Sequence, residues 1–103
     1  MRIRETNVEV PSGQDCCHAW FFVPEQLDGP AACIVLGHGF GLTRRCGMRE
    51  FALAFASSGY AVLLFDYRGF GDSGGTPRQV VSFRRQIEDW EAIVRFARAQ
   101  PEV

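Results

Sequence analysis

Hydrophobic positions along this chain follow a period of two in some segments and a helical period in others. Residues 3–10 alternate loosely and residues 17–23 are aromatic and β-branched, which predicts two strands joined by a turn at 11–14. Residues 31–36 and 60–65 are continuous apolar runs, which are typical of strands buried on both faces. The first two strands are expected to form an antiparallel hairpin.

Two other segments carry apolar residues at helical spacing. The first runs up to Gly59, which supplies a stop signal, and its apolar positions are Met48, Phe51, Ala52 and Phe55. The second lies between Ser82 and Pro101, and its apolar stripe consists of Phe83, Ile87, Trp90, Val94 and Ala97. We expect both stripes to face the core, and the acidic positions of the second helix (Glu88, Asp89 and Glu91) to lie on a solvated face with neighbouring arginines.

The predicted order of elements is β-β-β-α-β-α. Two buried strands that are each followed by a helix imply a parallel sheet with right-handed crossovers. The fold class is therefore α/β, with an N-terminal β-hairpin followed by a parallel βαβα unit, in one domain over residues 1–103. Ligands in such sheets bind at the carboxyl ends of strands, where the Gly-rich loops 37–41 and 69–75 are expected to lie.

Composition removes several classes of partner and cofactor. The net charge is -1, so nothing favours nucleic acid or an anionic membrane, and no apolar run reaches the ~18 residues of a membrane span. No signal peptide is evident. The cysteines lack the spacing of a metal site, and nothing indicates a cofactor. The cysteines are Cys16, Cys17, Cys33 and Cys46, and we expect them to be reduced thiols of a cytoplasmic protein.

The Gly-rich segment 65–75 matches three functional signatures at once. One is the dinucleotide fingerprint Gly69-x-Gly71-x-x-Gly74, which requires the glycines to lie directly between a strand and a helix. Pro77 and several polar residues separate these glycines from the predicted helix. The acidic residues about 20 positions further on also lie on a helix rather than at a strand end. Nucleotide binding therefore stays a subsidiary hypothesis.

The other two signatures both place a nucleophile at Ser73. The pattern Gly71-x-Ser73-x-Gly75 resembles a nucleophile elbow, in which the serine occupies a sharp strand-to-helix turn and a histidine follows later in the chain. Ser73 lies well past the strand, and no histidine follows it. The string 71–75 also occurs around the serine of trypsin-like proteases, but those are built from β-barrels. Neither reading fits the predicted elements.

The segments together resemble the N-terminal half of an α/β-hydrolase. Residues 34–41 (Ile-Val-Leu-Gly-His-Gly-Phe-Gly) are similar to that fold's third strand and its His-Gly oxyanion turn. Residues 51–66 look like its first helix and fourth strand, and Asp66-x-Arg68-Gly69-x-Gly71-x-Ser73 looks like the loop that follows. The resemblance covers nearly the whole chain. Dienelactone-hydrolase-like and Xaa-Pro-dipeptidyl-peptidase-like members look closest, on the segments 75–79, 86–90 and 98–103.

This resemblance implies a serine hydrolase that cleaves an ester, lactone or peptide-like bond through an acyl-enzyme. One oxyanion donor in such a fold is a backbone N–H of the loop after the third strand. By position this donor is the N–H of Phe40, with Gly41 as the alternative, while Gly39 and His38 complete the oxyanion turn. His38 precedes any nucleophile in the chain, so we expect it to form structural hydrogen bonds rather than to act as the base.

The resemblance also implies that the nucleophile, acid and base all follow Val103. We therefore expect an N-terminal fragment, truncated before the nucleophile strand and inactive alone, whose full-length protein binds a small ester or peptide-like substrate. The alternative is a non-catalytic stand-alone or pairing module. The family's strand order 1-2-4-3-5 would leave residues 31–36 as an open sheet edge, which makes self-association through that edge a further expectation.

Overall fold

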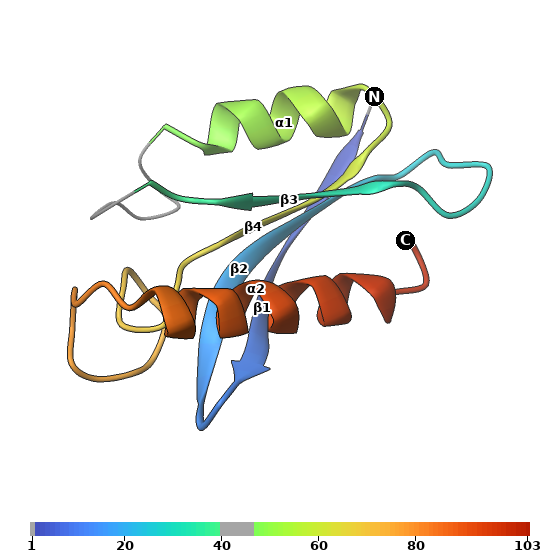
Figure 1. Ribbon diagram of the computed structural model, residues 1–103. Coiled ribbons are helices and arrows are strands. Elements are labelled where there is room, and N and C mark those ends of the chain that lie inside the picture. The colour runs from blue at the N-terminus through green and yellow to red at the C-terminus, as the bar shows by residue number, and fades with distance from the viewer. Residues whose placement is uncertain (1, 40–46) are drawn as a thin grey trace.

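The computed structural model describes residues 2–39 and 47–103. These residues form a four-stranded sheet with one helix packed on each face (Figure 1). No helix among them has both the length and the apolarity needed to cross a bilayer. In chain order the elements are β1 (Ile3–Ser12), β2 (Asp15–Pro24), β3 (Cys33–Gly37), α1 (Arg49–Ser57), β4 (Ala61–Phe65) and α2 (Phe83–Arg98).

The strands lie in the order β1-β2-β4-β3. β1 and β2 form the predicted antiparallel hairpin, and β2 continues into an antiparallel pairing with β4. β3 and β4 are parallel, with Leu36 opposite Leu64, and α1 connects them. The predicted α/β fold, a hairpin followed by a parallel βαβα unit, is therefore confirmed.

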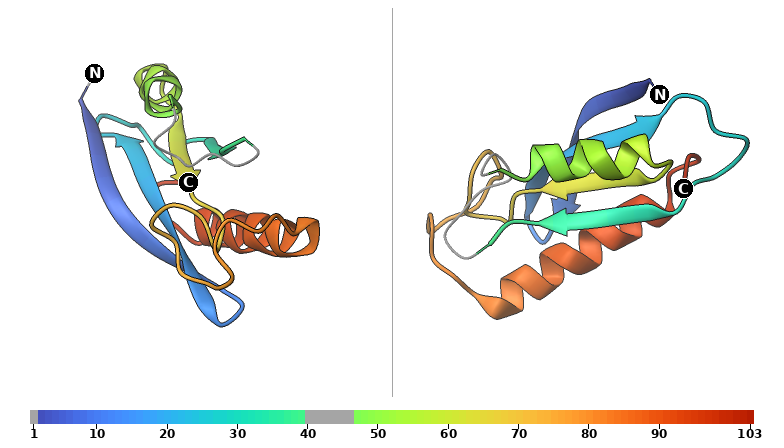
Figure 2. Two further views of the ribbon diagram at one scale, coloured as in Figure 1. Left: turned by 90° about the vertical axis from the view of Figure 1, so that its left-hand side faces the viewer. Right: turned by 90° about the horizontal axis from the view of Figure 1, so that it is seen from above.

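The centre of the core is β4, which has a strand on each side and a helix over each face (Figure 2). Successive side chains of a strand point to opposite faces of its sheet. Leu63 and Phe65 accordingly join the apolar cluster beneath α2, whereas Val62 and Leu64 join the cluster beneath α1. Every residue of β4 is buried, which matches the continuous apolar run that predicted this strand.

The apolar run at 31–36 gave a less accurate prediction. It predicted a strand buried on both faces, but every residue of β3 is only half-buried. The reason is its position, because β3 is the last strand of the described sheet and has a hydrogen-bonded neighbour only in β4 (Figure 1). Its outer edge carries backbone groups without a strand partner among the described residues.

The apolar stripe predicted for α2 was right only for part of its length, since Trp90 and Ala97 pack in the core while the residues at its N-terminal end do not. Phe83 is 75% exposed and Ile87 is 59% exposed, while the face of the helix turned toward the sheet buries smaller residues and one acid. Those buried residues are Asp89, Ala92, Ile93 and Ala97. α1 behaves in the same way, because Phe51 is 61% exposed while Ala52 and Ala56 are buried. Helical spacing defines a face, but only the neighbours decide which face is covered.

Candidate functional site

The candidate site lies where β3 and β4 end at the same edge of the sheet. Their parallel register places Gly37 opposite Phe65, so His38 and Asp66 leave the sheet side by side. Gly37 is required by close packing, since a Cβ there would lie 2.8 Å from the Trp90 ring and 3.0 Å from the Tyr67 hydroxyl. That hydroxyl accepts a hydrogen bond from the Trp90 indole N–H (2.9 Å), which ties α2 to the same edge.

His38 is buried at this edge and is hydrogen-bonded at both ring nitrogens. Its ring lies edge-on to Tyr67, with 4.6 Å between ring centroids, and 5.5 Å from the ring of Phe70. The backbone N–H of Tyr67 donates to His38 Nε2 (3.2 Å), and His38 Nδ1 lies 3.0 Å from the carbonyl oxygen of Gly39. An amide N–H can only donate and a carbonyl can only accept, so this arrangement requires the tautomer protonated at Nδ1.

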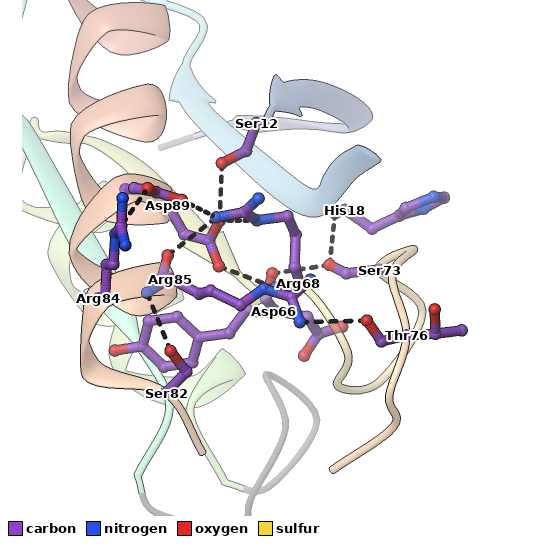
Figure 3. Close-up of polar contacts among 12 residues, drawn as sticks. Ser12, His18, Asp66, Arg68, Ser73, Thr76, Ser82, Arg84, Arg85 and Asp89 are labelled. Atoms are coloured by element: carbon purple, nitrogen blue, oxygen red, sulfur yellow. Dashed lines mark hydrogen bonds and ion pairs between the residues drawn. The ribbon is translucent and has the colours of Figure 1, made fainter. Parts of the chain in front are cut away.

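Ser73 is a structural anchor of the loop that follows β4. Its hydroxyl donates to the carbonyl of Asp66 (2.7 Å) and accepts from the backbone N–H of His18 (2.8 Å). The next residue continues this attachment, because the Gly74 N–H donates to the carbonyl of Cys16 (3.0 Å). Figure 3 shows Ser73 between the loop and the strand that carries His18. The hydroxyl is therefore committed to backbone groups rather than to an imidazole.

Arg68 connects the same loop to α2 and to the hairpin (Figure 3). Its backbone N–H and its guanidinium both donate to the buried carboxylate of Asp89. The Ser12 hydroxyl donates to that carboxylate from the end of β1 (2.7 Å), and a further guanidinium N–H reaches Glu88 (2.8 Å). Asp89 is therefore held by one backbone N–H and one guanidinium N–H of Arg68, and such charge-assisted hydrogen bonds are short and strong. We call Ser12, Arg68 and Asp89 the buried charge network.

The charges of this network shift the pKa values of its members. Burial alone would lower the pKa of Arg68, but hydrogen bonds and charge from Glu88 and Asp89 outweigh it, so the pKa is raised. The pKa of Glu88 is lowered by its hydrogen bond to Arg68. Burial raises the pKa of the Cys17 thiol, and the neighbouring negative charge of Asp89 adds to this effect. Cys17 is therefore held as a neutral thiol.

Asp89 was misplaced by the sequence analysis, which assigned it to a solvated face of the second helix. It is fully buried, whereas Glu88 and Glu91 beside it are exposed. The three acids stand close together in the sequence, and nothing in the local pattern separates the buried one from the others. The hydroxyl of Ser12 and the backbone N–H of Arg68, which make the burial of Asp89 possible, are far away along the chain.

The predicted oxyanion turn is described only in part. His38 and Gly39 are described, with His38 buried and Gly39 exposed, whereas Phe40 and Gly41 lie outside the described residues. Phe70 is buried against His38. Arg68 braces this loop against α2 through Asp89. Tyr67 was not singled out from the sequence, although its backbone N–H and hydroxyl both reach neighbouring elements.

These elements define an α/β-hydrolase fold, and comparison with known proteins agrees. Residues 28–103 match the family model described as "Serine aminopeptidase, S33". The match spans well over half of the chain, and the chain therefore belongs to this family of the α/β-hydrolase superfamily.

Several curated proteins are similar to this chain. The quorum-quenching protein AidA of Acinetobacter baumannii is 42% identical over 93 residues, an alignment that covers 90% of this chain and 30% of that protein. The thiohydrolase aneE of Aspergillus aculeatus is 42% identical over 76 residues, covering 74% of this chain and 23% of that protein. The chain thus spans less than a third of the length of these curated relatives.

This chain is also similar to about a third of the length of larger proteins whose structures have been solved. A hypothetical protein of Pseudomonas aeruginosa matches with a TM-score of 0.91 and 30% identity, covering 98% of this chain and 32% of that one. An esterase of Pyrococcus furiosus matches with a TM-score of 0.76 and 26% identity, covering 97% of this chain and 37% of that one. The arrangement of strands and helices described above is therefore shared with solved proteins about three times as long, one of them an esterase.

Proposed function

We propose that this chain is the N-terminal part of a serine hydrolase that cleaves an ester, lactone or peptide-like bond through an acyl-enzyme. In this proposal the turn after β3 supplies one oxyanion donor, the backbone N–H of Phe40 with Gly41 as the alternative, and His38 and Gly39 hold the turn. The nucleophile, acid and base are contributed by residues outside this chain. The observation that carries the proposal is the buried His38, hydrogen-bonded between Tyr67 and Gly39 at the carboxyl edge of a hydrolase sheet.

The relatives support a substrate with an activated acyl group. Thiohydrolases stand among the curated relatives, and an esterase is among the similar structures. Loss of one oxyanion donor in an acyl-transfer enzyme costs about 3–4 kcal/mol of transition-state stabilisation, so the turn after β3 would carry a large share of the rate. Within the superfamily, we propose dienelactone-hydrolase-like or Xaa-Pro-dipeptidyl-peptidase-like chemistry.

The proposed compartment is the cytoplasm, and the free thiols of Cys16, Cys17 and Cys33 support this proposal.

The test uses the whole protein and the isolated 103-residue chain side by side. We expect the whole protein to hydrolyse p-nitrophenyl esters, thioesters or aminoacyl anilides and to react with a fluorophosphonate probe, and the isolated chain to do neither. Ser73→Ala in the whole protein should retain hydrolysis, because that hydroxyl is engaged by backbone groups. Hydrolysis by the isolated chain that disappears in Ser73→Ala would contradict the proposal.

A second proposal concerns the chain on its own, as a non-catalytic or pairing module. It is favoured by the outer edge of β3, which has no strand partner among the described residues, and by the exposed apolar residues Phe83 and Ile87 on α2. Gel filtration separates the two proposals. With no hydrolase activity in the whole protein, a monomeric chain with dispersed NMR signals would favour a stand-alone module, and a discrete dimer would favour a pairing module.

A further inference from the structure

The segment between β4 and α2 curls back on itself at the carboxyl edge of the sheet (Figure 1). The N–H of Gly69 donates to the carbonyl of Gly74 (2.8 Å), and the carbonyl of Gly69 accepts from the N–H of Gln79 (2.8 Å). Gly69, Gly71 and Gly75 all have positive φ, a conformation that residues with a Cβ rarely adopt. This tight bending turns several carbonyl groups of the loop toward one point.

Three of these carbonyl groups converge on the guanidinium of Arg78. Its Nη1 donates to the carbonyls of Ser73 (2.7 Å) and Gly75 (3.3 Å), and its Nη2 donates to that of Gly71 (2.7 Å). Within residues 2–39 and 47–103, no backbone N–H donates to these three carbonyls, and Arg78 has no carboxylate partner. We call the carbonyls of Gly71, Ser73 and Gly75 the carbonyl cage.

A cluster of main-chain carbonyl oxygens is an electronegative site, and proteins use such oxygens to hold cations. The planar fork of a guanidinium presents several N–H donors in fixed directions, whereas an ammonium is a compact point charge. Several acceptors that converge on one group therefore suit a guanidinium. The side chain of Arg78 is exposed, so the carbonyl cage can be reached from solvent.

Two members of the carbonyl cage also contact Asp66, which directly follows β4. The Ser73 hydroxyl donates to the carbonyl of Asp66 (2.7 Å), and a Cβ on Gly71 would lie 2.4 Å from the Asp66 carboxyl. Phe70, in the same loop, packs on the ring of His38 with 5.5 Å between centroids. A guanidinium that fixes the cage therefore also fixes the loop against the residues that follow β3 and β4.

We propose that the loop after β4 is a guanidinium-binding site that Arg78 occupies within the same chain, and that Arg78 is thereby a positioning residue for the carboxyl edge of the sheet. The binding site follows from the contacts of the loop alone. The effect on turnover rests, in addition, on the proposed serine hydrolase function. Different measurements therefore test the two parts.

Replacing the side chain by a free guanidinium tests the binding site directly. We expect Arg78→Ala to lower the Tm of the whole protein by several degrees, and methylguanidinium to raise it again, saturably and at millimolar concentration. Nitrogen-15 NMR of this variant should show the largest shifts at the amides of Asp72, Gly74 and Thr76, whose peptide units contain the three carbonyls. The wild type, in which the cage is filled, and Arg84→Ala, which removes an exposed arginine of α2, should not respond.

A second cation and a second variant test the preference for a guanidinium. Tetramethylammonium carries the same charge without N–H donors, so it should not restore the Tm of Arg78→Ala. Arg78→Lys brings a charge without the planar fork and should keep only part of the lost stability. Equal recovery with tetramethylammonium, an equal response to methylguanidinium in Arg84→Ala, or NMR shifts confined to other parts of the protein would each overturn the binding site.

The hydrolysis of a p-nitrophenyl ester tests the positioning role. The kcat is measured well below the Tm and per active site titrated with a fluorophosphonate, so that unfolded protein is not counted. We expect Arg78→Ala to lower this kcat about 10- to 100-fold, as a small displacement near a reacting centre does. Methylguanidinium should restore the kcat over the same concentration range in which it restores the Tm.

The outcomes are distinguishable from failure of the proposed function. Recovery of the Tm without recovery of kcat, or an unchanged kcat in Arg78→Ala, would overturn the positioning role and leave the binding site standing. An inactive wild-type protein would overturn the proposed function and the positioning role together. The Tm and the NMR shifts would still decide the binding site, because neither depends on activity.

Discussion

Cys16 and Cys17 are adjacent in β2 and have opposite surroundings. Successive residues of a strand face opposite sides of its sheet, and here Cys17 faces the core beneath α2 while Cys16 is half-buried on the other face. Cys17 is fully buried, and burial raises the pKa of its thiol, with the charge and hydrogen bond of Asp89 adding to this. Only the thiolate is an effective nucleophile, so the two thiols should react at different rates.

The first prediction is that iodoacetamide at pH 8 modifies Cys16 well before Cys17 in the folded protein. Mass spectrometry of proteolytic peptides, quenched at successive times, measures both rates in one sample. The denatured protein is the control, since unfolding should make the two rates equal. Equal rates in the folded state would contradict the burial of Cys17.

The second prediction concerns stability in alkali. Burial raises the pKa of Cys33 to about 11 from its ordinary value of 9.0. The unfolded chain loses this proton first, so the stabilisation of the neutral thiol is fully present below pH 9 and is lost as the pH rises through 11. We expect the free energy of unfolding, measured in urea, to fall between pH 8.5 and about 10.5, and to fall less in Cys33→Ala. An identical decrease in both proteins would rule this cause out.

The third prediction compares two glycines with positive φ. At Gly71 (φ 51°) a Cβ would lie 2.4–2.7 Å from atoms of the buried carboxyl of Asp66, whereas at Gly59 (φ 98°) no atom lies within 4 Å. Gly59→Ala should therefore cost only backbone strain, about 1–2 kcal/mol. Gly71→Ala should cost more, because the loop after β4 must also move. Denaturant unfolding of both variants measures the difference, and equal losses would contradict the contact.

At the scale of elements, the buried charge network joins parts of the chain that are far apart in sequence. Ser12 ends β1, Arg68 lies in the loop after β4, and Asp89 lies in α2. Removing one partner of a buried ion pair leaves the other charge without compensation, which is more costly than losing an exposed pair. The network therefore holds the loop, the hairpin and the helix in one arrangement.

The fourth prediction is that Asp89→Asn lowers the free energy of unfolding by about 3 kcal/mol, because the guanidinium of Arg68 stays buried without its main counter-charge. Arg84→Ala is the matched control on the same helix. Its contact with Glu88 is long (3.9 Å) and its side chain is 90% exposed, so its loss should change stability by less than about 0.5 kcal/mol. Similar losses in the two variants, measured by chemical denaturation, would show that the network contributes little.

At the scale of the whole molecule, the described residues leave one sheet edge and two large apolar side chains of α2 uncovered. The outer edge of β3 has no strand partner among the described residues, and Phe83 and Ile87 of α2 are exposed. A hollow further along α2 is lined by both apolar and charged residues, namely Trp90, Glu91, Val94, Arg95 and Arg98. Exposed apolar patches and open strand edges favour association.

The fifth prediction is that the isolated 103-residue chain self-associates through this surface. Gel filtration with light scattering should show dimers or larger species, and Phe83→Glu with Ile87→Lys should shift the chain toward the monomer. Arg84→Glu, an exposed change on the same helix, should not. A monomeric wild-type chain that unfolds in a single cooperative transition would contradict the self-association and support the prediction of one domain over residues 1–103.

The sequence by itself determined the elements and the fold class, because hydrophobic periodicity reports local geometry. The runs at 60–65 and in the hairpin led to the right strands, and resemblance to the α/β-hydrolases led to the right superfamily and strand order. His38 was also expected to form structural hydrogen bonds, and it is hydrogen-bonded at both ring nitrogens.

Tertiary structure alone decided which faces and which polar groups are covered. In the helical stripe of α2, Trp90 and Ala97 pack in the core whereas Phe83 and Ile87 face outward. β3 is half-buried because it lies at the edge of the described sheet. Asp89 is buried because Ser12 and Arg68, distant along the chain, satisfy its carboxylate. A local pattern does not contain these partners, since burial of a polar group depends on contacts between elements that meet only in the folded molecule.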